Sequence, residues 1–333
     1  MSQRIKDVIP ESAKAMIRPI YNKINLSPTT NSVGEKKLIP LNKRDPELYS
    51  SFNEEEKHVA SNINTICIPL GPYRNLTTLL ASLFATHFQC LTLNHAGKRI
   101  LSDKKIDFFH QKNDKSIEKF LLIATRLSQG GRRGDYGGNI QLSHAFDDGK
   151  LDYLYKKYKG NAILNRQIKV LFWKESMRIT NHLFKNQINP NLLTFEDKKL
   201  KYIIPIRNPL DCATSNLKTK HYKHITTEHI DNKINLTYKI LDIYKKLFDF
   251  SKLNSNAFLS FTEREFNKDT LKSICNFVDI DFNNQWADDI ISYINLKSKY
   301  SHEKSEIIRY KDYVKKLFKD DMQLQQRFIY MLE

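Results

Sequence analysis

Short apolar runs bounded by turn residues mark the candidate strands of this chain. Residues 65–70 and 201–206 are each long enough for a buried strand, and each runs into a loop and then a helical pattern. Residues 168–173 and 257–261 have the same character. Helical periodicity fits residues 77–84, 116–127, 151–158, 175–184 and most of the chain after residue 233. Strands that alternate with helices predict an α/β fold with a parallel sheet.

The pattern divides the chain into an N-terminal arm, residues 1–60, and one α/β domain, residues 61–333. The arm opens with a short amphipathic helical pattern over residues 10–24, and a polar stretch predicted as a loop follows at residues 27–37. A basic amphipathic helix can lie on an anionic membrane. Because Pro19 interrupts the pattern and such helices more often dock on their parent domain, we expect at most peripheral membrane contact.

The net charge of the chain favours some classes of binding partner but does not identify one. The 333 residues carry a formal net charge of +17, which favours polyanionic or phosphate-bearing partners. Lysines spread over solvated faces would give the same total. The chain has no zinc-finger, RNP or helix-turn-helix signature, so we expect no nucleic-acid partner. A non-enzymatic basic module that binds nucleic acid or an anionic glycan stays open as an alternative.

The cysteines and the N-terminal residues indicate the cellular compartment and whether a metal site is expected. Cys67, Cys90, Cys212 and Cys275 are scattered, with no CxxC and no nearby His pair, which is unlike a disulfide framework or a zinc site. We therefore predict a reducing compartment and no metal. The chain also lacks the apolar run of a signal peptide and any stretch of about 18 uncharged apolar residues. These features predict a cytoplasmic protein.

Two strand-loop-helix units carry candidate anion sites. In the first, a helix N-terminus with Arg74, Thr77 and Thr78 follows a buried strand, which is typical of a phosphate cradle, although a threonine cap beside an incidental arginine would look the same. In the second, Arg207 ends the strand where an NTPase would place a magnesium-binding Asp. A Walker A glycine and lysine are also absent. The pattern argues against ATP hydrolysis, with a P-loop-type nucleotide kinase kept as an alternative.

The residues of these units resemble the sulfotransferases that depend on 3′-phosphoadenosine 5′-phosphosulfate (PAPS). Residues 73–78, Tyr-Arg-Asn-Leu-Thr-Thr, are similar to that family's Pro-Arg/Lys-Ser-Gly-Thr-Thr loop, which binds the 5′-phosphosulfate. Residues 207–215 resemble its Arg-Asp/Asn-Pro-x-Asp-x-x-x-Ser motif, which binds the 3′-phosphate. The resemblance spans about residues 66–277. It implies PAPS contacts from Arg74, Asn75, Leu76, Thr77, Thr78, Arg207 and Ser215.

The resemblance implies a fold and a reaction. The fold would be P-loop-like, with three layers and a central parallel β-sheet flanked by helices. The reaction would move a sulfuryl group in line from PAPS to a hydroxyl or amine of a small-molecule or glycan acceptor, without a metal. Leu76 departs from the family's glycine, so we expect the loop to avoid the backbone conformation that glycine alone adopts readily. Asn75 departs from its serine.

The same resemblance implies catalytic roles for Arg74 and Lys174. Arg74 would neutralise the bridging oxygen, and Lys174 takes the place of the family's second catalytic lysine; its alternative is a solvated charge paired with Glu175 or Glu228. His95, 95 − 74 = 21 residues beyond Arg74, is our candidate general base, since its ordinary pKa is about 6.5. A histidine that caps the turn before Gly97 would look the same.

The most glycine-dense stretch of the chain is predicted to contact the acceptor. Residues 130–138 combine glycine with Arg132, Arg133 and Tyr136, which suits a lid or an acceptor-binding loop, although a plain loop would share the pattern. His144, just downstream, is a second candidate for the base. A later loop with Lys297, Lys299 and Tyr300 is a candidate cover for the PAPS site.

Overall fold

The fold was taken from a computed structural model, which describes residues 49–130, 138–147, 149–226, 230, 232–294, 296 and 300–332. The predicted amphipathic helix of the arm lies outside these residues. So do Arg132, Arg133, Tyr136, Glu228, Lys297 and Lys299.

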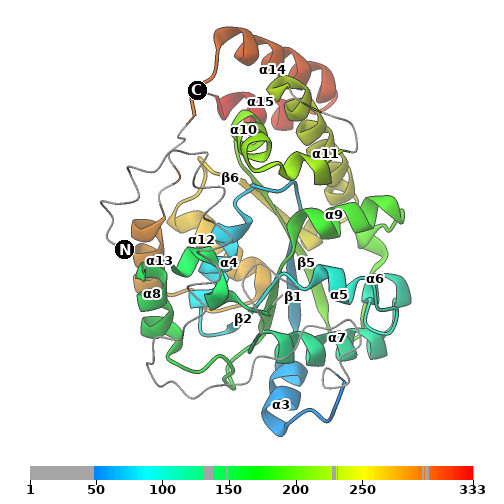
Figure 1. The fold of residues 1–333 in the computed structure, drawn as a ribbon, viewed down its shortest axis with the longest axis vertical. Helices are drawn as coiled ribbons and strands as arrows, with labels where there is room; N and C mark the ends of the chain where they lie inside the picture. The colour runs from blue at the N-terminus through cyan, green and yellow to red at the C-terminus, as the bar shows by residue number, and fades with distance from the viewer. Residues whose placement is uncertain are drawn as a thin grey trace, which may run out of the picture. The chain divides into compact units, whose positions relative to one another are not determined.

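A six-stranded sheet forms the centre of the described chain (Figure 1). Its order is β3-β2-β4-β1-β5-β6, and each neighbouring pair is parallel except β2 with β3. In this register Thr65 lies opposite both Val170 and Lys199. The strands are β1 (Thr65–Pro69), β2 (Cys90–Asn94), β3 (Gly138–Asn139), β4 (Val170–Lys174), β5 (Lys199–Ile206) and β6 (Phe258–Thr262).

Alternation along the strands separates two hydrophobic layers. Ile66 and Ile68 of β1 belong to one core cluster, while Cys67 between them belongs to the other. This follows from the two-residue period of a strand. One cluster is covered by α4 (Thr77–Thr86), α8 (Lys150–Lys159), α12 (Lys268–Val278) and α13 (Asn284–Tyr293).

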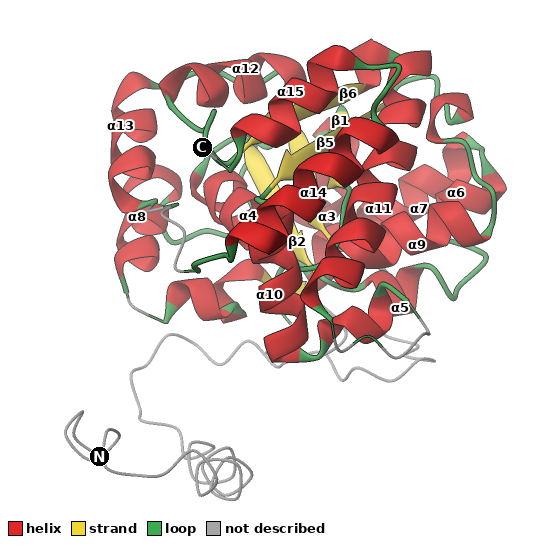
Figure 2. Cartoon of the chain, turned by 90° about the horizontal axis from the view of Figure 1, so that it is seen from above, coloured by secondary structure: helices red, strands yellow, loops and turns green. Residues whose placement is uncertain are grey.

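The second cluster takes its cover from the other helices of the domain. These are α3 (Glu54–Asn62), α5 (Gly97–Ile100), α6 (Phe108–Gln111), α7 (Asp114–Leu127), α9 (Ser176–Lys185), α10 (Pro209–Thr219), α11 (Lys233–Leu253), α14 (Lys304–Leu317) and α15 (Met322–Tyr330). Both views place α8, α12 and α13 on one side of the sheet and α6, α7 and α9 on the other (Figure 2). The arrangement confirms the predicted three-layer α/β fold, with a P-loop-like strand-loop-helix from β1 into α4.

The strand pattern differs from the prediction at one edge of the sheet. Sequence periodicity assigned no element to residues 90–94, whereas β2 lies there and carries the antiparallel β3. All five residues of β2 are buried, but the run Cys-Leu-Thr-Leu-Asn is short and has no Gly or Pro directly beside it to mark its ends. The four cysteines are buried free thiols. Within the described residues, none of the helices combines the length and apolarity that crossing a membrane requires.

Topology brings the predicted site to the centre of the sheet. The carboxyl ends of parallel strands lie at one edge, and β4 and β5 flank β1 on opposite sides. Such a switch point is where ligands bind in open α/β sheets. The loop after β5 turns into α10 through Asn208, whose side chain accepts the Leu210 N–H, and Pro209 at the first helical position.

One stability prediction concerns the buried ion pair that joins α3 to α7. Arg126 Nη2 lies 2.7 Å from Glu56 Oε2 and its Nε lies 3.0 Å from Oε1, with both side chains almost fully buried. The substitution Glu56→Gln removes the carboxylate charge that contacts this buried guanidinium and should lower the free energy of unfolding by about 3 kcal/mol in urea denaturation. The exposed pair Lys57–Glu54 provides the control, since Lys57→Ala should change it by less than about 0.5 kcal/mol. Equal effects would contradict the prediction.

Candidate active site

A cavity of about 700 Å³ opens at the carboxyl edge of the central strands. Its wall unites most of the predicted site residues, namely Arg74, Asn75, Leu76, Thr77, Thr78, His95, His144, Lys174 and Arg207. Ser215 does not line the cavity; it is buried behind Arg74. The strand ends of β1, β2, β4 and β5 thus place side chains that are far apart in the sequence around one space.

The cavity wall is strongly basic. Among the described residues that line it, five are Arg or Lys (Arg74, Lys98, Lys174, Arg178 and Arg207) and one is acidic (Glu175), a formal balance of 5 − 1 = +4. A concave site with charge of one sign concentrates ligands of the opposite sign. The donor set therefore fits a ligand with several anionic groups.

The loop between β1 and α4 has an unusual backbone. Arg74 and Leu76 both adopt left-handed conformations, with φ of 64° and 51°. The expectation that Leu76 would keep the loop out of this region was wrong. A non-glycine residue can adopt it at a cost of roughly 1–2 kcal/mol, and the hydrogen bonds of the neighbouring Asn75 side chain hold the loop. Leu76 also offers no side-chain cap to α4, which leaves the first N–H groups of that helix open to an anion.

Asn75 is the residue that holds this loop. Its buried Oδ1 accepts hydrogen bonds from the Arg207 backbone N–H at 3.1 Å and from the Tyr244 hydroxyl at 2.8 Å. Its Nδ2 has no partner among the described residues. That amide lies only 2.4 Å from where a Cβ on Gly71 would stand, so the position tolerates glycine alone. Asn75 thus ties the β1 loop to the end of β5.

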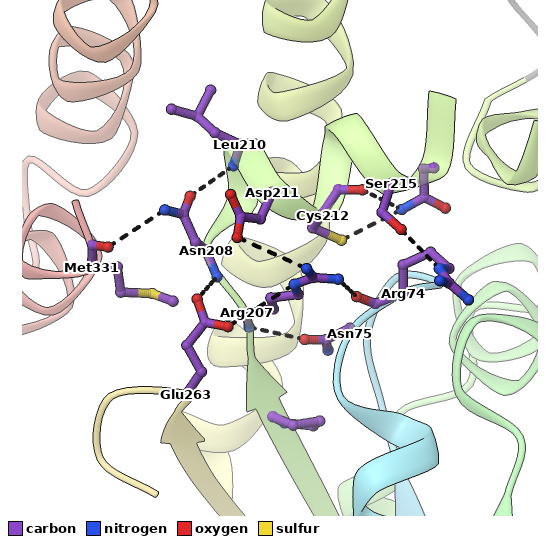
Figure 3. Close-up of polar contacts among 12 residues, drawn as sticks. Arg74, Asn75, Arg207, Asn208, Leu210, Asp211, Cys212, Ser215, Glu263 and Met331 are labelled. Carbon is purple, nitrogen blue, oxygen red and sulfur yellow. Dashed lines mark hydrogen bonds and ion pairs between the residues drawn. The ribbon is translucent and has the colours of Figure 1, made fainter. Parts of the chain in front are cut away.

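Arg74, Ser215 and Arg207 form a contact between the two motifs (Figure 3). Arg74 Nε donates to Ser215 Oγ at 2.9 Å, and Arg207 Nη1 donates to the Arg74 carbonyl oxygen at 3.4 Å. Arg207 also lies 3.8 Å from Asp211 Oδ2 and 4.0 Å from Glu263 Oε2. Both guanidinium groups are therefore oriented before any ligand arrives.

Contacts of the second motif, residues 207–215, also stabilise the start of α10. Glu263, just after β6, accepts the Asn208 backbone N–H at 2.9 Å, and burial raises the pKa of this carboxyl. Asp211 is fully buried and lies 2.8 Å from His302 Nε2. The Asn-Pro-x-Asp part of the motif therefore supports the start of α10, while Arg207 alone of these residues reaches the cavity.

Lys174 lies at the end of β4 with its charge buried. Its Nζ donates to Asn94 Oδ1 at 3.1 Å, and the side chain is only 6% exposed. This excludes the alternative of a solvated charge. Burial lowers the pKa of Lys174 to about 8, and the like charge of Arg74 adds to the effect. The ammonium is thus mostly protonated at pH 7 and weakly solvated.

His95 and Glu175 lie together beside Lys174. The His95 backbone is held in a left-handed conformation by its N–H, which donates to the Lys174 carbonyl, and by its own carbonyl, which accepts from Trp173 Nε1. Its Nδ1 lies 4.0 Å from Glu175 Oε2. Burial, followed by the cations Lys174 and Arg178, lowers the pKa of His95, so the half-exposed ring is neutral at pH 7.

Glu175 is a buried carboxylate that sequence reasoning considered only as a partner for Lys174. Its Oε2 accepts the Gly97 N–H at 2.9 Å, and its Oε1 lies 3.4 Å from Arg178 Nε. Burial raises its pKa against the opposing effect of Arg178. A Cβ on Gly97 would stand 2.6 Å from the Glu175 side chain. This close approach explains why glycine occupies position 97.

Two further residues that line the cavity, His221 and His224, lie on η5 (His221–His224). No sequence motif indicated that they belong to the site. The rings of His221 and His224 lie 5.3 and 5.2 Å from the Tyr73 ring, centroid to centroid. Burial and then Arg74 lower the pKa of His221. These three rings form an aromatic wall beside the arginines.

Comparison with known proteins gives structural similarity without sequence similarity. Neither a scan against models of protein families nor a search of curated proteins found a match. The chain is similar to the sulfotransferase domain of the Synechococcus PCC 7002 olefin synthase, with a TM-score of 0.38, 13% identity and coverage of 76% of this chain and 95% of that one. It is also similar to a sulfotransferase domain from the curacin biosynthetic pathway, with a TM-score of 0.39, 10% identity and coverage of 77% and 98%.

The buried environment of Lys174 predicts an abnormal titration. In an NMR titration of lysine side chains labelled at Cε, Lys174 should titrate near pH 8, whereas exposed lysines titrate near 10.4. Arg74→Ala should move the Lys174 midpoint upward because it removes a like charge. The control Arg166→Ala, an exposed arginine before β4, should leave it unchanged. A Lys174 midpoint above 10 in the unsubstituted protein would contradict burial of the ammonium.

Proposed function

We propose that this protein is a sulfotransferase that moves a sulfuryl group from PAPS to a hydroxyl or amine of a small-molecule or glycan acceptor. The observation that carries the proposal is the contact between Arg74 and Arg207. These two arginines follow different strands and face one basic cavity. Arg207 donates to the Arg74 carbonyl oxygen, and Ser215 accepts a hydrogen bond from the Arg74 side chain.

PAPS carries two separate anionic groups, and the cavity offers two sets of donors. Arg74, Thr77 and Thr78 with the uncapped start of α4 would hold the 5′-phosphosulfate. Arg207 would hold the 3′-phosphate, and Ser215 would contribute by fixing the Arg74 guanidinium beside it. A guanidinium fork matches such oxygens better than an ammonium does.

The chain's own cations would do most of the catalytic work. PAPS would supply a sulfuryl group bonded to a phosphate that can leave as an anion. Arg74 and Lys174 face the region where that negative charge develops, and both are oriented beforehand by hydrogen bonds. Preorganised donors of this kind stabilise a transition state without reorganising during the reaction.

His95 would accept the proton of the acceptor. The pKa of His95 is lowered to about 3, so the ring is neutral at pH 7 but weakly basic. It would take the proton only as the new S–O or S–N bond makes that proton acidic and the bond to the leaving phosphate breaks. Glu175, 4.0 Å from Nδ1, would then stabilise the charged ring. His144 lines the same cavity and is the second candidate for the base. Arg132, Arg133 and Tyr136 remain proposed acceptor contacts.

Nucleotide binding tests the proposal directly. Titration with PAP, the 3′-phosphorylated product nucleotide, should show binding at least about tenfold tighter than 5′-AMP in calorimetry, because 5′-AMP lacks the group that Arg207 would hold. Arg207→Ala should abolish the preference, while the control Arg166→Ala should preserve it.

Other outcomes of that titration would replace the proposal. If PAP binds no better than 5′-AMP to the unsubstituted protein, the PAPS site is wrong. Tighter binding of ATP–Mg²⁺ would favour a nucleotide kinase. Steeply salt-dependent binding of nucleic acid without nucleotide preference would favour a basic binding module.

Lys174 should affect turnover more than binding. With ³⁵S-labelled PAPS and an acceptor identified by screening phenols and saccharides, Lys174→Met should lower kcat by about 10²–10³-fold, because it removes one charge that stabilises the transition state. The Kd for PAP should change less than about tenfold. Unchanged kcat would remove Lys174 from the catalytic residues.

A further inference from the structure

Three side chains that commonly bind metals meet outside the cavity, where α6 lies beside α9 (Figures 1 and 2). Asp107 directly precedes α6, His110 lies on α6 and His182 lies on α9. One ligand atom from each of the three lies within 4.8 Å of the others. Nothing in the proposed sulfuryl transfer uses them.

The spacing of these atoms is close to that of a metal site. Asp107 Oδ2 lies 2.6 Å from His110 Nδ1 and 3.2 Å from His182 Nε2. Zinc bonds of about 2.0–2.1 Å in tetrahedral geometry place ligand atoms about 3.3 Å apart. Small shifts of the carboxylate and the His110 ring would therefore admit an ion between them.

His182 supplies an independent indication. Its Nε2 is buried and makes no hydrogen bond among the described residues, although Asp107 Oδ2 is only 3.2 Å away. The ring and the carboxylate are thus near each other but not aligned for an N–H···O bond. A buried nitrogen without a partner is uncommon and calls for an explanation such as an ion. A metal would use the Nε2 lone pair of the tautomer that carries its proton on Nδ1, which lies 3.3 Å from the Asn186 side-chain amide.

The surroundings orient the three ligands. The second oxygen of Asp107, Oδ1, accepts the Phe109 N–H at 3.2 Å and so fixes the carboxylate. The His182 ring packs 5.8 Å from the Phe109 ring and 4.9 Å from the His110 ring, between centroids. The His110 side chain is 45% exposed, which leaves access for a water as fourth ligand.

We propose that Asp107, His110 and His182 form a binding site for a divalent transition metal, with Zn²⁺ as the ion that fits best. Two imidazoles and one carboxylate suit zinc, whereas Mg²⁺ prefers oxygen ligands. The site revises the expectation of no metal. The sequence did not indicate this metal site, because His182 lies 182 − 110 = 72 residues beyond His110 and the three residues form no short ligand motif.

The metal would fix a helix that supports the cavity. On α9, Thr180 Oγ1 accepts the Gly71 N–H at 2.9 Å at the start of the β1 loop, and Arg178 contacts Glu175. An ion that clamps α9 to α6 would therefore stabilise the positions of both residues. We assign the site a structural role and no step of the transfer.

Metal titration of the untagged, chelator-treated protein tests the site. Calorimetry with Zn²⁺ should give one equivalent of saturable binding, and Mg²⁺ should give none. Asp107→Asn and His182→Gln should each weaken Zn²⁺ binding by about 100-fold or more, since even residues behind the ligands contribute 10- to 100-fold. The control His58→Gln, an exposed histidine on α3, should bind Zn²⁺ like the unsubstituted protein.

Thermal unfolding gives a second measurement that does not depend on the buried substitutions folding. With Zn²⁺ in large excess over Kd, Tm should rise by about 3 °C or more in the unsubstituted protein and in His58→Gln, but not in His110→Gln, whose changed side chain is partly exposed. The absence of one-equivalent binding, or binding that His110→Gln and His182→Gln leave intact, would overturn the proposal and leave a hydrogen-bonded Asp-His-His cluster.

Discussion

The arrangement of the site depends on one buried amide. Asn75 accepts the Arg207 N–H and the Tyr244 hydroxyl with a single oxygen, and this joins the end of β1 to the end of β5 and to α11. Without that link, the Arg74 carbonyl that accepts from Arg207 would not be held beside it. The two arginines of the cavity are therefore positioned by a neutral side chain.

Electrostatics sets a second constraint, since a basic cavity must remain folded when it is empty. Each guanidinium meets a neutral oxygen, Ser215 Oγ for Arg74 and a carbonyl for Arg207, and the acidic groups near Arg207 stay 3.8–4.0 Å away. The arginines are therefore oriented without being fully neutralised. Lys174 Nζ likewise donates a hydrogen bond to a neutral oxygen, Asn94 Oδ1. Such partial compensation leaves positive charge available to an incoming anion.

Sequence patterns predicted the architecture better than the details of the site. Apolar runs located β1, β4, β5 and β6 because those strands are buried and bounded by turns, whereas β2 lacked any such contrast. Motif order indicated which residues share the cavity. It could not indicate that Ser215 would contact Arg74, or that Glu175 would accept the Gly97 N–H, because those contacts depend on loop conformation. Residues 131–137 of the glycine-dense loop lie outside the described residues, so the acceptor contacts of Arg132, Arg133 and Tyr136 stay a prediction.

The left-handed backbone at Leu76 has a consequence for how such proteins are found. The conformation is adopted without glycine, at the steric cost that a Cβ imposes on a left-handed backbone. Motif searches that require glycine at this position therefore find only the loops in which glycine adopts the left-handed conformation. They miss loops of the same shape in which another residue adopts it. Signatures written in terms of backbone shape and strand-end cations would include divergent chains that letter-based signatures pass over.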